Sequence, residues 1–299
     1  MSNKRLSKKP TKENQSGIIQ VSVFGALDVR KNQQPVHLSI TGTTRSLLQF
    51  LLCNHERLSR REKLMEAFWP DTRVDRRRSS LNSAIWRIKK GLVDCAPITL
   101  DATAECVRLT GLHAPKVKVD FISLEAAIQS IEHSDTTEAP QLNQLMTALA
   151  QCEGEPLEGL EDDWATVERE RLSHLRIRGL TLAMQALAQV QKYEQALDMG
   201  KRIMRLDPFR ECTFQEMLCL HVLNGQRVKA LQMFREFEQS LRDDLGIEPM
   251  VETRALRDYL AQDRSPLAQN NHLPHIWQSN VTSLLATIDH SRDALRAFC

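Results

Sequence analysis

The chain has 299 residues, which leaves room for about two domains at the usual size of roughly 150 residues each. With 41% hydrophobic and 26% charged residues, its composition is that of a globular protein, which excludes a collagen-like, low-complexity or wholly disordered chain. No apolar run approaches the roughly 20 residues of a membrane span, and residues 1–17 lack the apolar stretch of a signal peptide. We therefore expect neither membrane insertion nor secretion.

The seven cysteines are scattered along the chain and contain no C-x-x-C pair. This pattern predicts reduced thiols in a cytoplasmic protein. Cysteine and histidine do not cluster at the spacing of a structural zinc site, so we predict no metal site. The histidines beside Pro274 and the acidic run at residues 161–163 lack the partners of an active site. We predict no catalytic residues, no cofactor and no enzymatic activity.

Charge divides the chain into two parts. Residues 1–119 hold 22 Lys/Arg and 10 Asp/Glu, a net charge of +12, whereas residues 120–299 hold 18 basic and 28 acidic residues, a net charge of −10. Such a split suggests a polyanion-binding N-terminal domain joined to an acidic domain with another role. The alternative is that the charges only solvate two surfaces, and charge alone does not decide between the two interpretations.

The first hundred residues change their pattern several times. Residues 1–17 are basic and lack apolar periodicity, which predicts a disordered arm. Apolar and polar residues alternate over residues 19–40, as is typical of short antiparallel strands. The period becomes helical over residues 43–55. A second helix is predicted to start with a capping box at residues 59–62 and to end at Pro70.

A third predicted helix carries the hypothesis of DNA binding. Asp75 is its expected N-cap, and Leu81, Ile85 and Ile88 fall on a narrow apolar stripe that must face the core. The opposite side is cationic and rich in side chains that can bridge phosphates or reach base edges. Consecutive arginines in the first turn oppose the helix dipole, which favours a bound anion there. The alternative is a solvated surface helix with Trp86 packed against a neighbour.

Two β-like runs follow, at residues 98–100 and 106–109, and predict a hairpin. Strands, three helices and a hairpin form the pattern of a winged helix-turn-helix. In this order, and with Arg78-Ser79-Ser80-Leu81 in the third helix, the segment resembles the OmpR-type winged helix of the SARP-like regulators. The resemblance implies a wing at residues 103–108 and contacts to the groove and backbone of DNA from eight residues of the third helix. These are Arg76, Arg77, Arg78, Ser79, Asn82, Ser83, Arg87 and Lys90.

The second half of the chain reads as stacked helices. No β alternation persists between residues 120 and 260, and apolar stripes recur at helical spacing. The segment Tyr193-Glu194-Gln195-Ala196-Leu197 recurs as Arg227-Val228-Lys229-Ala230-Leu231, which places the two alanines 34 residues apart. This distance is the tetratricopeptide period, in which small alanines let paired helices pack closely.

Four motifs in this half resemble, in order, the bacterial transcriptional activation domain (BTAD). They are Trp164 with Arg169 and Arg171-Leu172, then Leu206-Asp207-Pro208-Phe209-Arg210-Glu211, then Asn224-Gly225-Gln226-Arg227, and then Leu245-Gly246-Ile247-Glu248-Pro249 with Glu252-Thr253. The prolines and glycines are suited to ending helices, so most of these residues are expected to be scaffold. They identify a family more than a binding site.

The predicted fold class is therefore an α+β winged helix-turn-helix domain followed by an all-α, tetratricopeptide-like helical domain. We assign residues 1–17 to the basic arm, 18–112 to the winged-helix domain, 120–262 to the BTAD, and 263–299 to a linker and a C-terminal amphipathic helix. That last helix is expected to pack back on the repeats, with docking of a partner or pairing of two protomers as alternatives.

The resemblance implies a transcriptional activator that binds double-stranded promoter DNA and contacts RNA polymerase or its sigma factor through the helical domain. It also implies direct repeats about one helical turn apart, roughly 10 to 11 bp, and a homo-oligomer on DNA. Such a protein is cytoplasmic and associated with the nucleoid. The alternative function is a tetratricopeptide-type scaffold for protein interaction whose basic domain binds nucleic acid without sequence preference.

Overall fold

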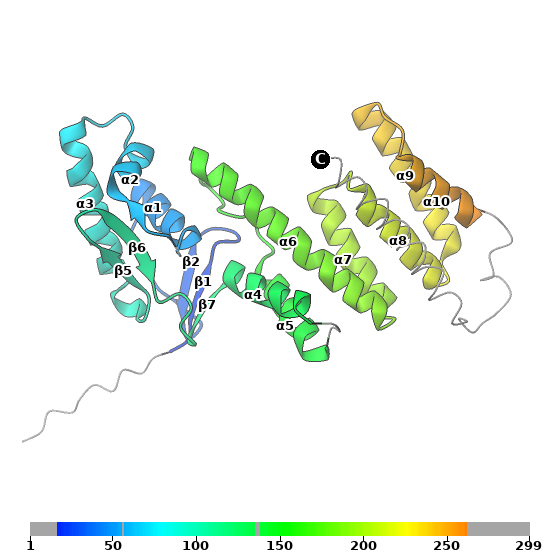
Figure 1. The fold of residues 1–299 in the computed structure, drawn as a ribbon, viewed down its shortest axis with the longest axis horizontal. Helices are drawn as coiled ribbons and strands as arrows, with labels where there is room; N and C mark the ends of the chain where they lie inside the picture. Colours follow the sequence, from blue (N-terminus) through cyan, green and yellow to red (C-terminus); the bar gives the residue numbers. More distant parts are fainter. Residues whose placement is uncertain (1–16, 56, 135–137, 262–299) are drawn as a thin grey trace, which may run out of the picture. The chain divides into compact units, whose positions relative to one another are not determined.

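The computed structural model describes residues 17–55, 57–134 and 138–261 (Figure 1). The chain divides into two compact units, residues 1–179 and 180–299, and each is described by itself. The predictions for the basic arm before residue 17 and for the linker and helix at 263–299 lie outside the described residues. Within the described ranges, no helix is long and apolar enough to cross a membrane.

The first unit opens with a four-stranded sheet in the order β3-β2-β1-β7. Its strands are β1 (Ile19–Ser22), β2 (Asp28–Lys31), β3 (Gln34–Pro35) and β7 (Val117–Val119). β1 pairs with β2 in antiparallel register and with β7 in parallel register, with Ile19 opposite Val117. The predicted alternation is correct for β1, where Ile19 and Val21 are buried. It is wrong for residues 36–40, which form no strand, and the parallel partner β7 was not predicted.

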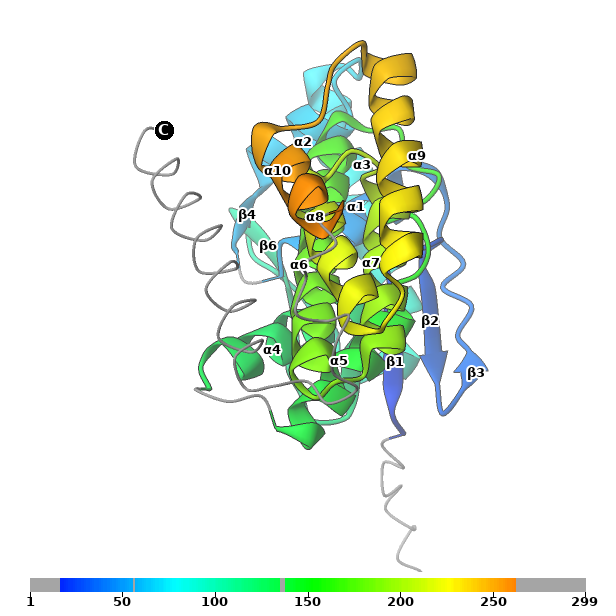
Figure 2. The same cartoon turned by 90° about the vertical axis from the view of Figure 1, so that its right-hand side faces the viewer.

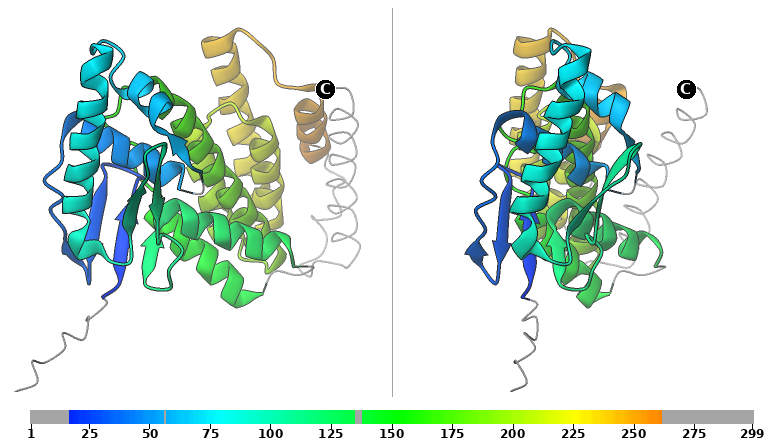
Figure 3. Two further views of the ribbon diagram at one scale, coloured as in Figure 1. Left: turned by 60° about the vertical axis from the view of Figure 1, so that its left-hand side comes forward. Right: turned by 90° about the vertical axis from the view of Figure 1, so that its left-hand side faces the viewer.

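Three helices and a second sheet follow (Figure 3). The helices are α1 (Gly42–Cys53), α2 (Arg61–Phe68) and α3 (Val74–Gly91), and a short 3-10 turn (Val93–Cys95) follows them. The sheet has the order β4-β6-β5, with β4 (Ser59–Arg60), β5 (Thr99–Ala102) and β6 (Cys106–Thr110). β5 and β6 form the predicted antiparallel hairpin, and Leu100 lies opposite Leu109. α3 packs against α1, α2 and β5.

The two predicted N-caps are wrong. Ser59 does not cap α2, because it belongs to β4 and pairs with Val107 of β6. Asp75 does not cap α3, because the helix begins one residue earlier at Val74 and Asp75 lies in its first turn. Ser59 is held by the pairing of β4 with β6, and the N-cap position of α3 is taken by Arg73, whose side chain makes no capping hydrogen bond.

Three further helices complete the first unit and lead into the second. They are α4 (Asp120–Glu132), α5 (Ala139–Gln151) and α6 (Asp163–Gln189), and the division between the units falls within α6. Asp120 ties α4 to the first sheet, since its Oδ2 accepts hydrogen bonds from the backbone N–H groups of Val23 (2.7 Å) and Phe24 (2.9 Å). Burial raises the pKa of this carboxyl group to about 6, against the effect of the hydrogen bonds.

Trp164, the first residue of the activator-domain motifs, packs on the N-terminal helices. Its ring meets Phe50 of α1 edge-on at 5.3 Å and lies 6.2 Å from Phe68 of α2. Its indole N–H donates to Ser46 Oγ at 3.3 Å, and Ser46 donates to Asp162 at 2.8 Å. The start of α6 is thus held against α1 and α2 by aromatic packing and hydrogen bonds within one unit.

Within its described residues, up to 261, the second unit is built of helices alone (Figure 2). After the end of α6 come α7 (Tyr193–Leu206), α8 (Glu211–Leu223), α9 (Arg227–Leu245) and α10 (Val251–Ala261). α7 and α9 begin 34 residues apart, and Ala196 and Ala230 are both fully buried, as the repeat predicts. Close packing is also required at Gly200, where an added Cβ would lie 2.6 Å from Met217 of α8.

Residues of the activator-domain motifs hold this unit together, as expected of scaffold. Glu211 at the start of α8 accepts a hydrogen bond from the backbone N–H of Met250 at 2.9 Å and another from the hydroxyl of buried Thr253. Gln215 donates to the same hydroxyl at 2.7 Å. Gly246 ends α9 in the left-handed conformation, at φ +68°, that glycine adopts without strain.

The predicted fold class is confirmed at the level of an N-terminal part with two small sheets and a predominantly helical remainder. The sequence predicted this division because the spacing of its apolar residues changes along the chain. Alternating apolar residues bury one face of a strand, whereas apolar residues at helical spacing bury one stripe of a helix.

Candidate nucleic-acid interface

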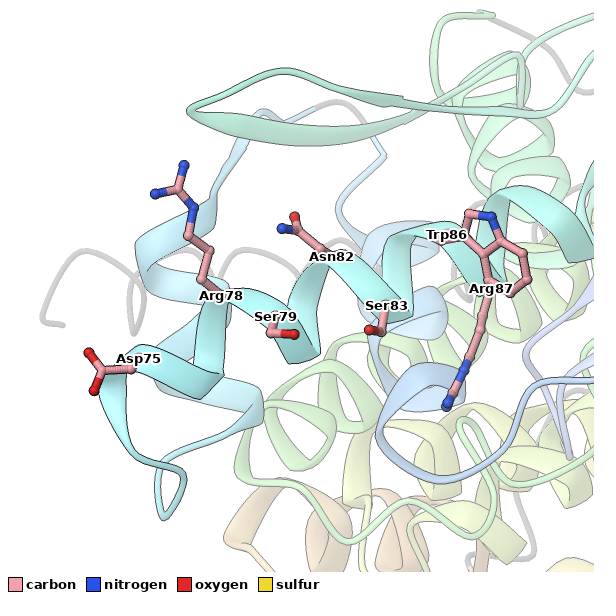
Figure 4. A pocket seen from close by; sticks show the side chains of 7 residues that line it. All are labelled: Asp75, Arg78, Ser79, Asn82, Ser83, Trp86 and Arg87. Atoms are coloured by element: carbon pink, nitrogen blue, oxygen red, sulfur yellow. The ribbon is translucent and has the colours of Figure 1, made fainter.

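An open depression of about 640 Å³ lies over the outer face of α3 (Figure 4). It is lined by Asp75, Arg78, Ser79, Asn82, Ser83, Trp86 and Arg87. All seven side chains come from this one helix, and five of them are among the eight predicted contact residues. The structure therefore gathers most of the predicted site on a single surface, which we call the α3 face.

Helical spacing arranges the α3 face in two rows. Arg78, Asn82 and Trp86 follow each other at intervals of four residues, as do Ser79, Ser83 and Arg87, so each row runs along the helix. The opposite side carries the apolar stripe predicted from the sequence, with Leu81 and Ile88 fully buried. Burial of the stripe fixes the rotation of α3, and that rotation turns both polar rows outward.

The three consecutive arginines at the start of α3 have different surroundings. Arg76 and Arg78 are exposed. The guanidinium of Arg77 turns back to the loop before the helix, where Nε donates to the carbonyl of Thr72 at 2.8 Å and Nη2 donates to the carbonyl of Pro70. Arg77 thus holds the turn between α2 and α3 and does not lie among the residues that line the depression.

The C-terminal half of α3 carries an exposed aromatic residue. Trp86 is 61% exposed, so it is not packed against a neighbour as the alternative interpretation required. Lys90 places its Nζ over the indole ring, 5.2 Å from the centroid. Lys90 is therefore exposed beside the α3 face, next to Trp86, although it does not line the depression.

Arg61 is a functional candidate that the sequence reasoning missed. It begins α2, and its guanidinium donates through Nη1 to the carbonyl of Thr103 at 3.2 Å and through Nη2 to Oδ1 of Asn82. Its backbone N–H also donates to the carbonyl of Glu105 at 2.8 Å. The pair Arg60-Arg61 at the start of the second helix was the available signal, but the side-chain partners of Arg61 are more than 20 residues away.

The turn of the hairpin lies at the predicted wing. The backbone N–H of Thr103 donates to the carbonyl of Cys106 at 2.9 Å, and the hydroxyl of Thr103 accepts from the N–H of Cys106 at 3.1 Å. The guanidinium of half-buried Arg108 on β6 lies 3.8 Å from the carboxylate of exposed Asp101 on β5. Arg61 therefore joins three elements, the start of α2, the middle of α3 and this closed turn.

The α3 face is suited to an extended anionic ligand with hydrogen-bonding groups. Arg78 and Arg87 supply ten N–H donors in planar groups that match phosphate oxygens or a guanine edge, since each guanidinium carries about five. Asn82, Ser79 and Ser83 add shorter polar groups between them. The N-terminus of α3 also presents the positive end of the helix dipole, which favours an anion.

Comparison with known proteins finds similarity to transcriptional regulators. Residues 119–260 match the family described as the bacterial transcriptional activator domain. Over 263 residues the chain is 23% identical to the regulatory protein AfsR of Streptomyces coelicolor, a match that covers 87% of this chain and 26% of that protein. Over 253 residues it is 22% identical to the transcriptional regulatory protein MoaR1 of Mycobacterium tuberculosis, covering 81% of this chain and 78% of that protein.

A solved structure has a similar fold. EmbR of Mycobacterium tuberculosis, determined in complex with a low affinity phosphopeptide, superposes with a TM-score of 0.66 at 21% identity, covering 92% of this chain and 71% of that one.

Residues 119–260 thus match the bacterial transcriptional activator domain, and the similarity of the chain to AfsR and MoaR1 supports a SARP-like transcriptional regulator. AfsR and MoaR1 are both named as regulatory proteins. The chain spans about a quarter of the length of AfsR, which has a large part without a counterpart here.

Proposed function

We propose that this protein is a sequence-specific DNA-binding transcriptional activator whose α3 inserts into the major groove of promoter DNA. The observation that carries the proposal is the α3 face, where exposed Arg78, Asn82 and Arg87 lie on the side of the helix opposite its buried stripe. In this proposal residues 18–112 are a winged helix-turn-helix domain, with α3 as recognition helix and the β5–β6 turn as wing. An α-helix fits the major groove, and these side-chain types contact phosphates and base edges.

The eight predicted residues take different roles in this proposal. Arg78, Ser79, Asn82, Ser83 and Arg87 face the groove, and Arg76 and Lys90 reach phosphates at the two ends of the helix. Arg77 supports the turn before α3, because its guanidinium is engaged by the carbonyls of Pro70 and Thr72. This assignment separates residues that contact DNA from one that positions them.

The activator part of the proposal rests on the family. We infer that the helical domain, residues 120–262, contacts RNA polymerase or its sigma factor. Protomers bind direct repeats about one turn of DNA apart, roughly 10 to 11 bp, as a head-to-tail oligomer. The site of action is then the nucleoid in the cytoplasm.

A second candidate function is a protein-interaction scaffold of the tetratricopeptide type. It is favoured by the exposed apolar side chains around the turn between α9 and α10, where Leu245, Ile247 and Met250 are about half exposed and Val251 is 67% exposed. A scaffold would bind nucleic acid through phosphates alone, without sequence preference.

Selection of bound duplexes from a random DNA pool at near-physiological salt, with the full chain, separates the two functions. A recovered motif repeated at about one-turn spacing supports the activator. Binding without a motif that is lost on a modest increase in salt supports the scaffold, because counterion release then supplies all of the affinity.

Replacing Asn82 and Arg87 together by alanine is expected to relax the selected motif and leave the fold intact. Each good base contact is worth about 1–3 kcal/mol of discrimination, so preference at the affected positions falls about fivefold or more. Repetition of the selection with this variant measures the effect. The matched control is Asn143→Ala with Arg205→Ala, which removes the same residue types from exposed helical positions outside α3. An unchanged motif in the Asn82 and Arg87 variant would contradict α3 as the reader.

A further inference from the structure

Arg61 restrains the orientation of Asn82 on the α3 face. Its Nη2 donates to Oδ1 of Asn82, and its Nη1 donates to the carbonyl of Thr103 at 3.2 Å. The residue itself is anchored by its backbone N–H, which donates to the carbonyl of Glu105 at 2.8 Å. The backbone of Arg61 is held by Glu105 and its Nη1 by Thr103, so its Nη2 is presented to Asn82 in a fixed place.

The chemistry of arginine decides which end of the Asn82 amide turns outward. Guanidinium carries only hydrogen-bond donors, so the atom of the amide that meets it must be the acceptor Oδ1. The Nδ2 amino group then points away from Arg61, and among the described residues it has no hydrogen-bond acceptor. Asn82 lines the open depression, so this amino group faces the space that a ligand of α3 would occupy (Figure 4).

An asparagine whose Oδ1 already accepts from a guanidinium reads base edges differently from a free one. Free asparagine pairs with adenine by accepting from N6 and donating to N7. Arg61 occupies one of the two lone pairs of Oδ1 and places its positive charge beside that oxygen, which disfavours a second donor such as adenine N6, whereas the Nδ2 amino group remains available to donate. In the major groove guanine offers two neighbouring acceptors, N7 and O6, whereas adenine offers N7 beside the N6 donor, which an amino group repels.

We propose that Arg61 fixes Asn82 as a hydrogen-bond donor and that Asn82 therefore selects guanine over adenine at the base it contacts. The inference rests on the proposed function of α3 as a recognition helix and adds the specificity of one position. Arg61 acts here as a positioning residue, because it acts on the base through Asn82.

The test uses the full chain and the motif selected from random DNA. The position that loses its preference when Asn82 is replaced by alanine is the base pair that Asn82 contacts. At that position the wild-type protein is expected to bind guanine about fivefold or more tightly than adenine, the lower limit for one bidentate contact. The readout is competition binding among four duplexes that differ only at this base pair.

Arg61→Met removes the donors and keeps an unbranched side chain, so the Asn82 amide becomes free to turn. Preference at the position is expected to shift toward adenine. The matched control is Arg60→Met, which removes the same charge from the neighbouring exposed residue and leaves Arg61 in place. This control is expected to keep guanine, so a shift in Arg61→Met alone cannot result from weaker attraction to phosphates.

Asn82→Asp provides a second variant that does not alter Arg61. It keeps the acceptor for Arg61 and removes the donors, so the preference for guanine is expected to disappear. Three outcomes would overturn the inference and leave the proposed function standing. The wild type could prefer adenine, a normally unfolding Arg61→Met variant could keep the preference for guanine, or Asn82→Asp could keep that preference. A chain that selects no motif contradicts the proposed function and the inference with it.

Discussion

Adjacent arginines on α3 show how the same residue type serves two purposes. Arg77 donates two hydrogen bonds to loop carbonyls, while Arg78 is exposed and lines the depression. One residue step rotates a side chain by about 100° around the helix, which moves it from the solvent to the preceding loop. The sequence presents three equal arginines, and their roles follow from what lies beside each one.

We expect Arg77→Ala to lower the free energy of unfolding by about 1–2 kcal/mol, because hydrogen bonds from a charged group are lost. Arg78→Ala is expected to change it by less than about 0.5 kcal/mol, as for most surface positions, and to weaken DNA binding. Urea unfolding and binding titrations of both variants measure the two effects. Equal stability of the two variants would show that Arg77 does not hold the turn.

Asp120 gives a second prediction at the residue scale. Its pKa is raised to about 6 in the folded protein, above its value of about 3.9 in an unfolded chain, so the folded state binds the proton more tightly. The stabilisation by protonation is complete below about pH 4 and is lost as the pH rises through about 6. Its full extent is about 3 kcal/mol.

The measurement is the free energy of unfolding of the wild type and of Asp120→Asn between pH 4 and pH 7. The amide does not titrate, so the advantage of the wild type over the variant is expected to shrink by about 3 kcal/mol across this range. A constant difference between the two proteins would mean that Asp120 titrates alike in the folded and unfolded states.

At the scale of elements, α3 is defined by the division between its two sides. The buried stripe is contributed by Leu81, Ala84, Ile85 and Ile88, and the exposed side carries the α3 face. Helical periodicity predicted this division because it depends only on spacing along the chain. The residues at which α2 and α3 start do not follow from spacing along the chain, so the predicted caps at Ser59 and Asp75 were wrong.

Leu81→Ala is expected to destabilise the protein by about 2–5 kcal/mol, because it opens a cavity at a fully buried position between α3 and its neighbours. Trp86→Ala is the control on the same helix, since its side chain is 61% exposed and its removal creates no cavity. Denaturant titrations of both variants give the comparison. A larger loss for Trp86→Ala than for Leu81→Ala would reverse the assignment of the two faces.

At the scale of the whole molecule, the charge split agrees with a division of roles between the two halves of the sequence. The net charge of +12 on residues 1–119 includes the arginines of α3, while residues 120–299 carry −10. In the proposed function, the net positive charge of residues 1–119 favours contact with phosphates and the net negative charge of residues 120–299 disfavours it. Binding to DNA should therefore depend strongly on salt.

Arg76→Ala is expected to lower the slope of log K against log salt concentration by about 1 and to leave the selected motif unchanged, as for a residue that contacts one phosphate. Lys229→Ala, an exposed charge on α9, is the control and is expected to leave the slope as it is. Binding measured at several salt concentrations checks both. A changed motif in Arg76→Ala would assign this residue to the bases.

The sequence by itself determined the features that depend on spacing along the chain. These are the change from strands to helices, the apolar stripe of α3, the β5–β6 hairpin and the 34-residue repeat of α7 and α9. Each is local or periodic, so its pattern is complete within a short segment.

Only the tertiary structure decided which distant residues meet. β1 pairs with β7 almost a hundred positions later, Asp120 accepts hydrogen bonds from Val23 and Phe24, and Arg61 reaches Asn82 and Thr103. No local pattern marks these partners, because each contact depends on how separate elements pack. The sequence therefore predicted a polar helix suited to DNA, and packing decided the orientation of the side chains that would read it.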